Sequence, residues 1–251
     1  MVNRKLKIVI FAYPDNPAGS YFIRSMFHQK IHVSAVLVEL KSKQLNWKRA
    51  REKIAKDGFK VTMQRIAQIM QLKRTRNTIV QLADESGIPV YQVENMNSHI
   101  CADYLDQIKP DLIVIASAPI LNKNIFSRAK IGCLNAHPGW LPKYRGIGAN
   151  AYAVYQGDLP GITIHWVDDG IDTGSIILRK SIKVLPKDTI AKINDRATRL
   201  GAEMMADVIK RIECDNIKSV RVKEPKGKLY RAMPYKEAKK INKMLKSKVI
   251  F

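Results

Sequence analysis

The sequence predicts an α/β fold with a Rossmann-like, mostly parallel twisted sheet and helices on both of its faces. Short apolar runs rich in β-branched residues, such as 7–13 and 111–116, alternate with segments of helical periodicity. Runs that are apolar at nearly every position are typical of strands buried on both faces of a parallel sheet. Two later runs end in turns crowded with polar residues, which is where open α/β sheets build their sites.

The N-terminal half is expected to supply the parallel part of this sheet. In chain order the expected elements are a strand over 7–13, a helix over 18–28, a strand over 33–40, a helix over 75–86 ended by Gly87, a strand over 88–93, a helix over 98–108 capped by Ser98, and a central strand over 111–116.

The C-terminal half is expected to complete the sheet and to end in a basic tail. Its expected elements are a strand that ends at Pro138, a helix over 148–155, strands over 161–167 and 176–184, a long helix to 212 capped by Asp188, short strands near 218–221 and 229–230, and a basic helix over 234–245. We therefore predict one domain over residues 1–214, with a basic helical insertion at about 41–72, and a short basic extension over 215–251.

Composition favours a reduced, cytoplasmic protein without a membrane span. No apolar run in the 251 residues approaches the roughly 20 needed to cross a bilayer, and the N-terminal segment lacks the apolar core of a signal peptide. The three cysteines are scattered, which argues against a disulfide framework and against a zinc knuckle.

The formal charge of +22 is concentrated in two stretches. Residues 41–80 hold twelve Lys/Arg and two Asp/Glu, and residues 215–251 hold twelve Lys/Arg and three Asp/Glu. Such a surface attracts polyanions: nucleic acid, anionic lipid headgroups or phosphorylated small molecules. A merely solvated basic face explains the same composition, and for the insertion we favour a helix that packs one face on its own domain.

Asn135 and His137 form the most informative pair. They are two residues apart on a predicted strand, so their side chains share one face, and Pro138 stops the strand directly after them. An amide can steady a developing oxyanion, and an imidazole can exchange a proton near neutral pH. Asp172 lies in a glycine-flanked turn, from which its carboxylate could orient the imidazole.

Each of these features also has an ordinary structural explanation. Asn-x-His after a strand is often a cap beside a satisfied histidine, and a Gly-Ile-Asp-Thr-Gly segment can be a simple turn. His165 alternates with apolar neighbours on its strand, and we interpret it as structural rather than catalytic. The combination of both motifs at this spacing is much more specific than either one alone.

The motifs resemble those of the 10-formyltetrahydrofolate-dependent formyltransferases, which include glycinamide ribonucleotide, methionyl-tRNA and sugar-nucleotide amine formyltransferases. The resemblance is carried by Asn-Ala-His-Pro at 135–138, Leu-Pro-Lys-Tyr-Arg-Gly at 141–146, Gly-Ile-Thr-Ile-His at 161–165 and Asp-Gly-Ile-Asp-Thr-Gly at 169–174. It implies the formyltransferase fold, the catalytic residues Asn135, His137 and Asp172, 10-formyltetrahydrofolate as formyl donor, and no metal.

The same resemblance suggests binding residues on either side of the catalytic ones. The donor-binding candidates are Ser117, Ala118, Pro119, Ile120, Leu121, Asp168, Asp169 and Gly170. Candidate contacts to the amine acceptor are Asn16, Gly19 and Ser20 after the first strand, where a helix N-terminus can attract an anion, and Lys143, Tyr144 and Arg145.

The amine acceptor stays open among several alternatives. A small, phosphorylated or nucleotide-linked acceptor, an amino-sugar nucleotide above all, fits the chain length and the basic surface. Methionyl-tRNA is the second alternative, because the positive charge of the chain favours a nucleic acid. Glycinamide ribonucleotide is the third. Hydrolysis of the donor, and reuse of the fold as a folate sensor or RNA-binding scaffold, are further alternatives. The amphipathic tail could also serve a homodimer.

Overall fold

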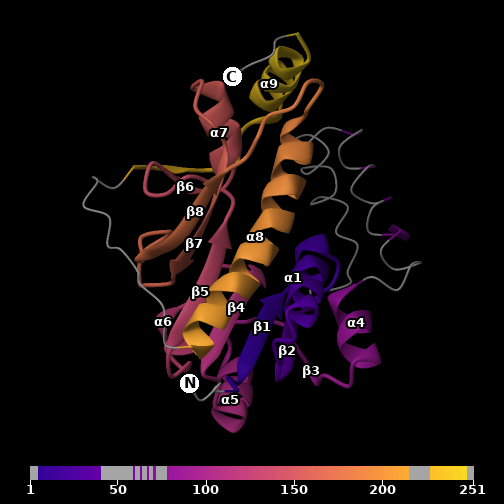
Figure 1. Cartoon of the computed structure of the whole chain (residues 1–251), viewed down its shortest axis with the longest axis vertical. Coiled ribbons are helices and arrows are strands. Elements are labelled where there is room, and N and C mark those ends of the chain that lie inside the picture. The colour runs from indigo at the N-terminus through magenta and orange to yellow at the C-terminus, as the bar shows by residue number, and fades with distance from the viewer. Residues whose placement is uncertain are drawn as a thin grey trace.

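The computed structural model describes residues 5–40, 78–214 and 227–247, together with positions 59, 63, 67, 70 and 71. Its elements are β1 Ile8–Ala12, α1 Pro17–His28, β2 Ala35–Glu39, α4 Ile79–Glu85, β3 Val90–Val93, α5 His99–Ile108, β4 Leu112–Ser117, α6 Lys123–Phe126, β5 Gly132–His137, β6 Tyr144–Gly146, α7 Ala149–Tyr155, β7 Gly161–Trp166, β8 Ile176–Ser181, α8 Ile190–Glu213, β9 Lys228–Tyr230 and α9 Tyr235–Ser247 (Figure 1).

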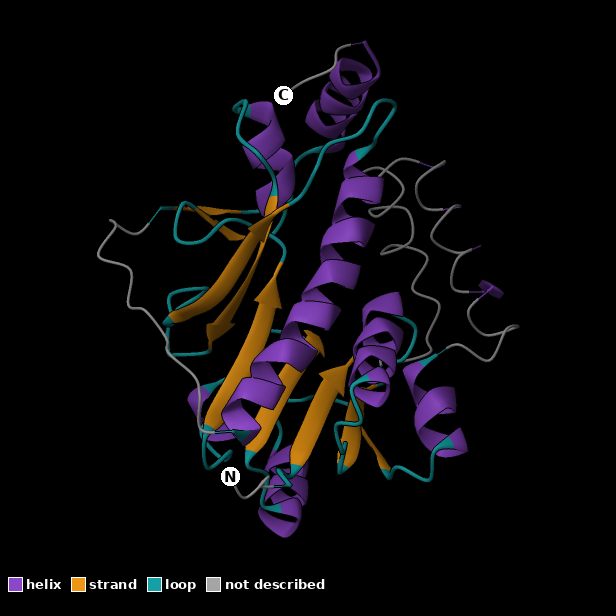
Figure 2. Ribbon diagram, viewed as in Figure 1, coloured by secondary structure: helices purple, strands orange, loops and turns teal. Residues whose placement is uncertain are grey.

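A seven-stranded sheet in the order β3-β2-β1-β4-β5-β7-β8 forms the centre of the molecule (Figure 2). The strands from β1 to β5 are parallel, whereas β7 is antiparallel to β5 and β8 is antiparallel to β7. The predicted Rossmann-like, mostly parallel sheet is confirmed. Strand order reverses between β1 and β4, and in such sheets the crevice outside the carboxyl ends of the strands near the reversal is where ligands bind.

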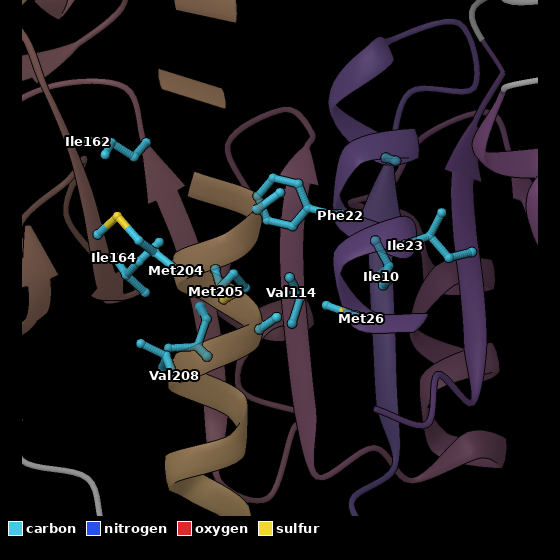
Figure 3. Packing of buried hydrophobic residues seen from close by; sticks show 14 of the residues in the cluster. Ile10, Phe22, Ile23, Met26, Val114, Ile162, Ile164, Met204, Met205 and Val208 are labelled. Atoms are coloured by element: carbon cyan, nitrogen blue, oxygen red, sulfur yellow. The ribbon is translucent and has the colours of Figure 1, made fainter. Parts of the chain in front are cut away.

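Two apolar cores cover the two faces of the sheet. On one face α1 and α8 pack through Phe22, Met26, Met204, Met205 and Val208 against strand residues that include Ile10, Val114, Ile162 and Ile164 (Figure 3). On the other face α5 and α6 pack on a second cluster that contains Val9, Phe11 and Ile113. Burial on both faces explains why the parallel strands are continuously apolar in sequence.

The long helix α8 begins differently from the prediction. Thr189 is its N-cap, and its side chain accepts a hydrogen bond from the backbone N–H of Lys192. The prediction of Asp188 as the cap is wrong, because its buried carboxylate accepts from the N–H of Leu185 and pairs with Arg196 at 2.9 Å instead. Sequence reasoning named only Asp188, because its ion pair with Arg196, eight residues later in the chain, cannot be read from the local pattern.

The C-terminal segment packs against the sheet domain. β9 pairs in parallel with β6, and α9 contacts α7 and α8 through the fully buried side chains of Ile241 and Leu245. The predicted basic helix at 234–245 is therefore present, and its apolar side is covered within the chain. The predicted strand at 218–221 and most of the basic insertion at 41–72 lie outside the described residues. Within the described ranges, no helix is long and apolar enough to cross a membrane.

Gly201 controls how closely α8 approaches the sheet, and this leads to a stability prediction. A Cβ atom at Gly201 would lie 3.0 Å from Cδ1 of Ile162, a fully buried residue of β7. Gly201→Val should lower the free energy of unfolding by about 1–3 kcal/mol, because it overpacks this contact. Urea denaturation would measure the loss, with Glu203→Val on the exposed side of α8 as control. Equal stability of the two variants would contradict close packing at Gly201.

Candidate active site

The strand β5 brings Asn135 and His137 to one corner of the sheet. The strand ends at His137, directly before Pro138, as predicted. In the antiparallel ladder Asn135 lies opposite His165, and His137 lies opposite Thr163. Residues directly opposite each other project from the same face of a sheet, so the register places a second histidine beside the predicted pair.

His137 is held by a hydrogen-bond acceptor on each side of its ring. The side chain is almost fully buried, and Nε2 lies 2.9 Å from the carbonyl oxygen of Tyr144. A carbonyl can only accept, so Nε2 carries a hydrogen and donates it. Nδ1 lies 3.3 Å from the Asp172 carboxylate, which would stabilise a proton taken up at that nitrogen.

Asp172 is positioned by the backbone around it. Its φ of 52° lies in the left-handed region, and its Oδ2 accepts a 2.7 Å hydrogen bond from the N–H of Gly146. The guanidinium of Arg145 donates to the carbonyl oxygen of Ile171 at 2.8 and 2.9 Å and so holds the preceding residue. Gly174 permits the turn, because a Cβ there would lie 1.7 Å from the Trp166 carbonyl oxygen.

His165 fixes the amide of Asn135. Its Nδ1 lies 2.8 Å from the carbonyl oxygen of Trp166 and therefore carries the hydrogen. Its Nε2 can then accept from the Asn135 amide at 3.2 Å, which leaves the second N–H of that amide for a substrate oxygen. His165 Nε2 also lies 3.6 Å from Asp172. Sequence reasoning treated His165 as structural and missed this position, because the signal is the β5–β7 register.

The charges of the site follow from burial and proximity. Burial has the largest effect on His137 and lowers its pKa, while the Asp172 charge opposes this effect. For Asp172, burial acts to raise the pKa, but His165, His137 and the Gly146 N–H outweigh it and lower the pKa to about 2. At neutral pH the site therefore holds a neutral imidazole next to an ionised carboxylate.

Gly139 and Thr163 shape the loop over His137, and sequence reasoning singled out neither. A Cβ at Gly139 would lie 2.5 Å from His137 Nε2, so only glycine leaves room for the ring. Thr163 Oγ1 donates to the Gly139 carbonyl at 2.7 Å and accepts from the Leu141 N–H at 3.2 Å. The glycine that follows His-Pro in the sequence was the available signal.

An amide donor, an imidazole and a buried carboxylate at the end of one strand suit acyl transfer through an oxyanion. The model of the formyl transferase family matches residues 6–209, which is most of the chain. The chain belongs to this family. This family assignment is the one that the sequence motifs predict.

Sequence relatives of the chain include methionyl-tRNA formyltransferases. The one from Rickettsia bellii is 35% identical over 144 residues, which are 57% of this chain and 47% of that protein. The one from Desulfotalea psychrophila is 36% identical over 149 residues, which are 59% of this chain and 46% of that protein. The chain thus matches about half the length of these curated relatives.

Solved structures of formyltransferases share the fold of the chain. A phosphoribosylglycinamide formyltransferase from Anaplasma phagocytophilum has a TM-score of 0.63 at 16% identity, covering 92% of this chain and all of that one. A sugar N-formyltransferase from a Shewanella species has a TM-score of 0.59 at 15% identity, covering 89% of this chain and 76% of that one. At these identities the likeness establishes the fold alone.

The predicted donor-binding residues lie on two segments of the chain, one after β4 and one after β7. The segment Ser117–Leu121 begins at the end of β4, where Leu121 is buried and Ile120 is 70% exposed. In the turn after β7, Asp168 accepts hydrogen bonds from the Gly170 N–H and the Thr173 hydroxyl. The two segments are joined by an exposed ion pair of 3.1 Å between Lys123 and Asp169.

The predicted acceptor residues of the first loop make contacts within the protein. The Asn16 side chain caps α1 by accepting from the Ala18 N–H. Gly19 packs against Ile79, since a Cβ there would lie 3.0 Å from that side chain, and Ser20 is 2% exposed. Their role toward an acceptor stays a prediction.

The predicted acceptor residues of the second group, 143–145, also make contacts within the protein. Lys143 pairs with Asp158 at 2.5 Å, Tyr144 is 1% exposed, and Arg145 holds the Asp172 turn. Acceptor contact by these three residues also stays a prediction.

Removal of the Asp172 charge should reveal its coupling to His137. Asp172→Asn withdraws the carboxylate that stabilises the imidazolium, so the pKa of His137 should fall further. We expect the acid limb of kcat/KM, which should already lie below pH 6.5 in the unchanged enzyme, to move to lower pH. The maximal rate should fall by roughly 10²–10⁴-fold.

The pH–rate profile of formyl transfer measures both effects. Asp106→Asn is the matched control, because that exposed aspartate of α5 pairs with Arg128, which precedes β5, whereas His137 lies at the other end of that strand. A shift of the acid limb to higher pH, or an undiminished rate, would contradict the assigned coupling.

Proposed function

We propose that this formyltransferase takes the formyl group from 10-formyltetrahydrofolate and transfers it to the amino group of methionyl-tRNA. The observation that carries the transfer is the joint placement of Asn135, His137 and an ionised, buried Asp172 at the end of β5. In this proposal residues 1–214 form the catalytic domain, and residues 215–251 are a short extension of it.

The reaction requires one bond to form and one to break. The neutral amine attacks the formyl carbon, and the carbonyl oxygen becomes an oxyanion that accepts from the free N–H of Asn135. Asp172 and His137 together take up the proton that the amine loses. The bond from carbon to N10 then breaks, and the proton passes to N10, which yields the N-formyl product and tetrahydrofolate.

The residues present fit the folate part of the donor. A flat ring requires an apolar wall with polar groups at its rim. Ala118, Ile120 and Leu121 are apolar, and Ile120 exposes 70% of its side-chain surface. The turn at 168–170 lies across from them and supplies carboxylates and backbone N–H groups. These two segments would hold the ring while β5 presents the formyl group to the amine.

The choice of acceptor rests on relatives and charge. The proteins that share 33–36% identity with this chain are named methionyl-tRNA formyltransferases, and the formal charge of +22 favours a polyanionic substrate. In the sequence analysis, chain length and the basic surface had favoured an amino-sugar nucleotide. The sugar N-formyltransferase and the 4-N formyltransferase among the structural neighbours are 15% and 16% identical, which supports only the shared fold.

The oxyanion role of Asn135 can be tested by truncation. Asn135→Ala removes the amide that faces the reacting oxygen, and turnover should fall by roughly 10²–10³-fold with little change in the free energy of unfolding. Release of tetrahydrofolate from 10-formyltetrahydrofolate in the presence of acceptor measures the rate. Asn124→Ala at an exposed position of α6 is the control. Undiminished turnover in Asn135→Ala would rule out this role.

The acceptor itself can be identified with the same release assay. We expect tetrahydrofolate formation with methionyl-tRNA and none with uncharged tRNA plus free methionine, because the aminoacyl ester is part of the substrate. A dTDP-linked amino sugar is offered in parallel. Turnover with the amino sugar and not with methionyl-tRNA would overturn the proposed acceptor while leaving the formyl-transfer chemistry intact.

A further inference from the structure

The helix α9 presents a row of lysines on the side opposite its buried residues. Lys236, Lys239, Lys240 and Lys243 are all exposed and follow the spacing i, i+3, i+4, i+7 that places residues on one helix face. Ile241 and Leu245 lie on the other side and are buried against the rest of the chain. We call these four lysines the α9 lysine face.

The sequence around this face adds almost no balancing negative charge. Glu237 is the single acidic residue between 227 and 247, and Lys228 and Arg231 add two further exposed cations ahead of the helix. Like charges three and four residues apart on a helix repel each other and destabilise it. A polyanion that lies along the face would relieve this repulsion.

The lysine face is held in a fixed place relative to the catalytic residues. β9 pairs with β6, and Gly146 of β6 donates the hydrogen bond that positions Asp172. At the other end, the side-chain oxygen of Asn242 accepts from the Ile190 N–H and ties α9 to the start of α8. Lys236 follows Tyr230 by six residues, so its Cα lies within about 20 Å of that strand residue.

The length of the face indicates what kind of anion it suits. Seven residues of helix separate Lys236 from Lys243, which corresponds to about 10 Å along the axis. A single diphosphate would contact one or two of these lysines, whereas a polynucleotide backbone supplies several phosphates in sequence. The proximity to β9 means that such a backbone could lie on α9 while its end reaches the site.

We propose that the α9 lysine face binds the phosphate backbone of an RNA whose end carries the reacting amine. The inference rests on the proposed function for the identity of that RNA, a tRNA. An anionic membrane is the less suitable partner, because surface helices bind membranes by inserting their apolar side. Here that side is covered by the protein itself through Ile241 and Leu245.

Charge-neutralising substitutions on α9 test the assignment in the full chain. The variant Lys236→Gln/Lys239→Gln/Lys240→Gln is compared with Lys5→Gln/Lys30→Gln/Lys109→Gln. The control lysines are exposed and precede β1, β2 and β4, so they lie at the amino ends of the parallel strands, whereas His137 lies at the carboxyl end of β5. Both variants lose the same charge.

Binding of fluorescein-labelled, unacylated tRNA is measured by anisotropy at several salt concentrations. The slope of the logarithm of the association constant against the logarithm of the salt concentration is negative, and three lost phosphate contacts should make it less steep by about 2–3. The affinity in about 0.1 M salt should fall at least tenfold. The control should keep the slope of the unchanged protein. Equal losses in both variants would overturn the proposal, as would binding of phosphatidylserine vesicles in place of tRNA.

A second readout separates this inference from the proposed function. The KM for methionyl-tRNA should rise in the α9 variant while kcat stays unchanged, because these lysines touch no reacting atom. Formyl transfer to methionyl-tRNA with unchanged KM and unchanged tRNA binding in that variant would refute the lysine-face assignment alone. Binding of tRNA through α9 without formyl transfer would support the lysine face and refute the proposed acceptor.

Discussion

The hydrogen bond from the Gly146 N–H to the Asp172 carboxylate is the contact on which the site depends. It joins β6 to the turn after β7, two segments that the chain separates by more than twenty residues. Asp172 adopts a left-handed φ to make it, and Arg145 holds the neighbouring carbonyl. Without this connection the carboxylate would have no fixed position relative to His137, and the imidazole would lose its charged partner.

Burial and charge act on this pair in opposite directions. His137 loses solvation and stays neutral at pH 7, whereas Asp172 remains ionised because N–H donors and rings surround it. Both shifts make the native state sensitive to acid. The folded protein resists protonation of His137 below pH 6.5 and of Asp172 below about pH 4, while the unfolded chain does not, so stability falls as pH drops through these ranges.

Local patterns in the sequence were enough to predict the strands of the sheet and the pair Asn135 and His137, but not the rest of the site. The period of two along β5 placed Asn135 beside His137, and Pro138 marked the end of the strand. His165 could not be assigned in this way, because its face is decided by its pairing with Asn135 across the β5–β7 ladder. The cap of α8 could not be assigned from local sequence either. Asp188 pairs with the distant Arg196, and Thr189 caps the helix in its place.

Residues 143–145 make structural contacts within the chain, and acceptor contact by them stays a prediction. Sequence reasoning offered these residues as acceptor contacts, but their side chains bond to Asp158 and to the carbonyl of Ile171. The backbone of the same segment pairs with β9, and stacked rings of Tyr144 and Tyr230, with centroids 5.7 Å apart, reinforce the pairing. The segment therefore positions the catalytic carboxylate, and it attaches the C-terminal extension to the site. Exposed positive charge also lies on Lys228, Arg231 and α9. Under the proposed function, an acceptor larger than a single nucleotide would therefore contact the extension as well.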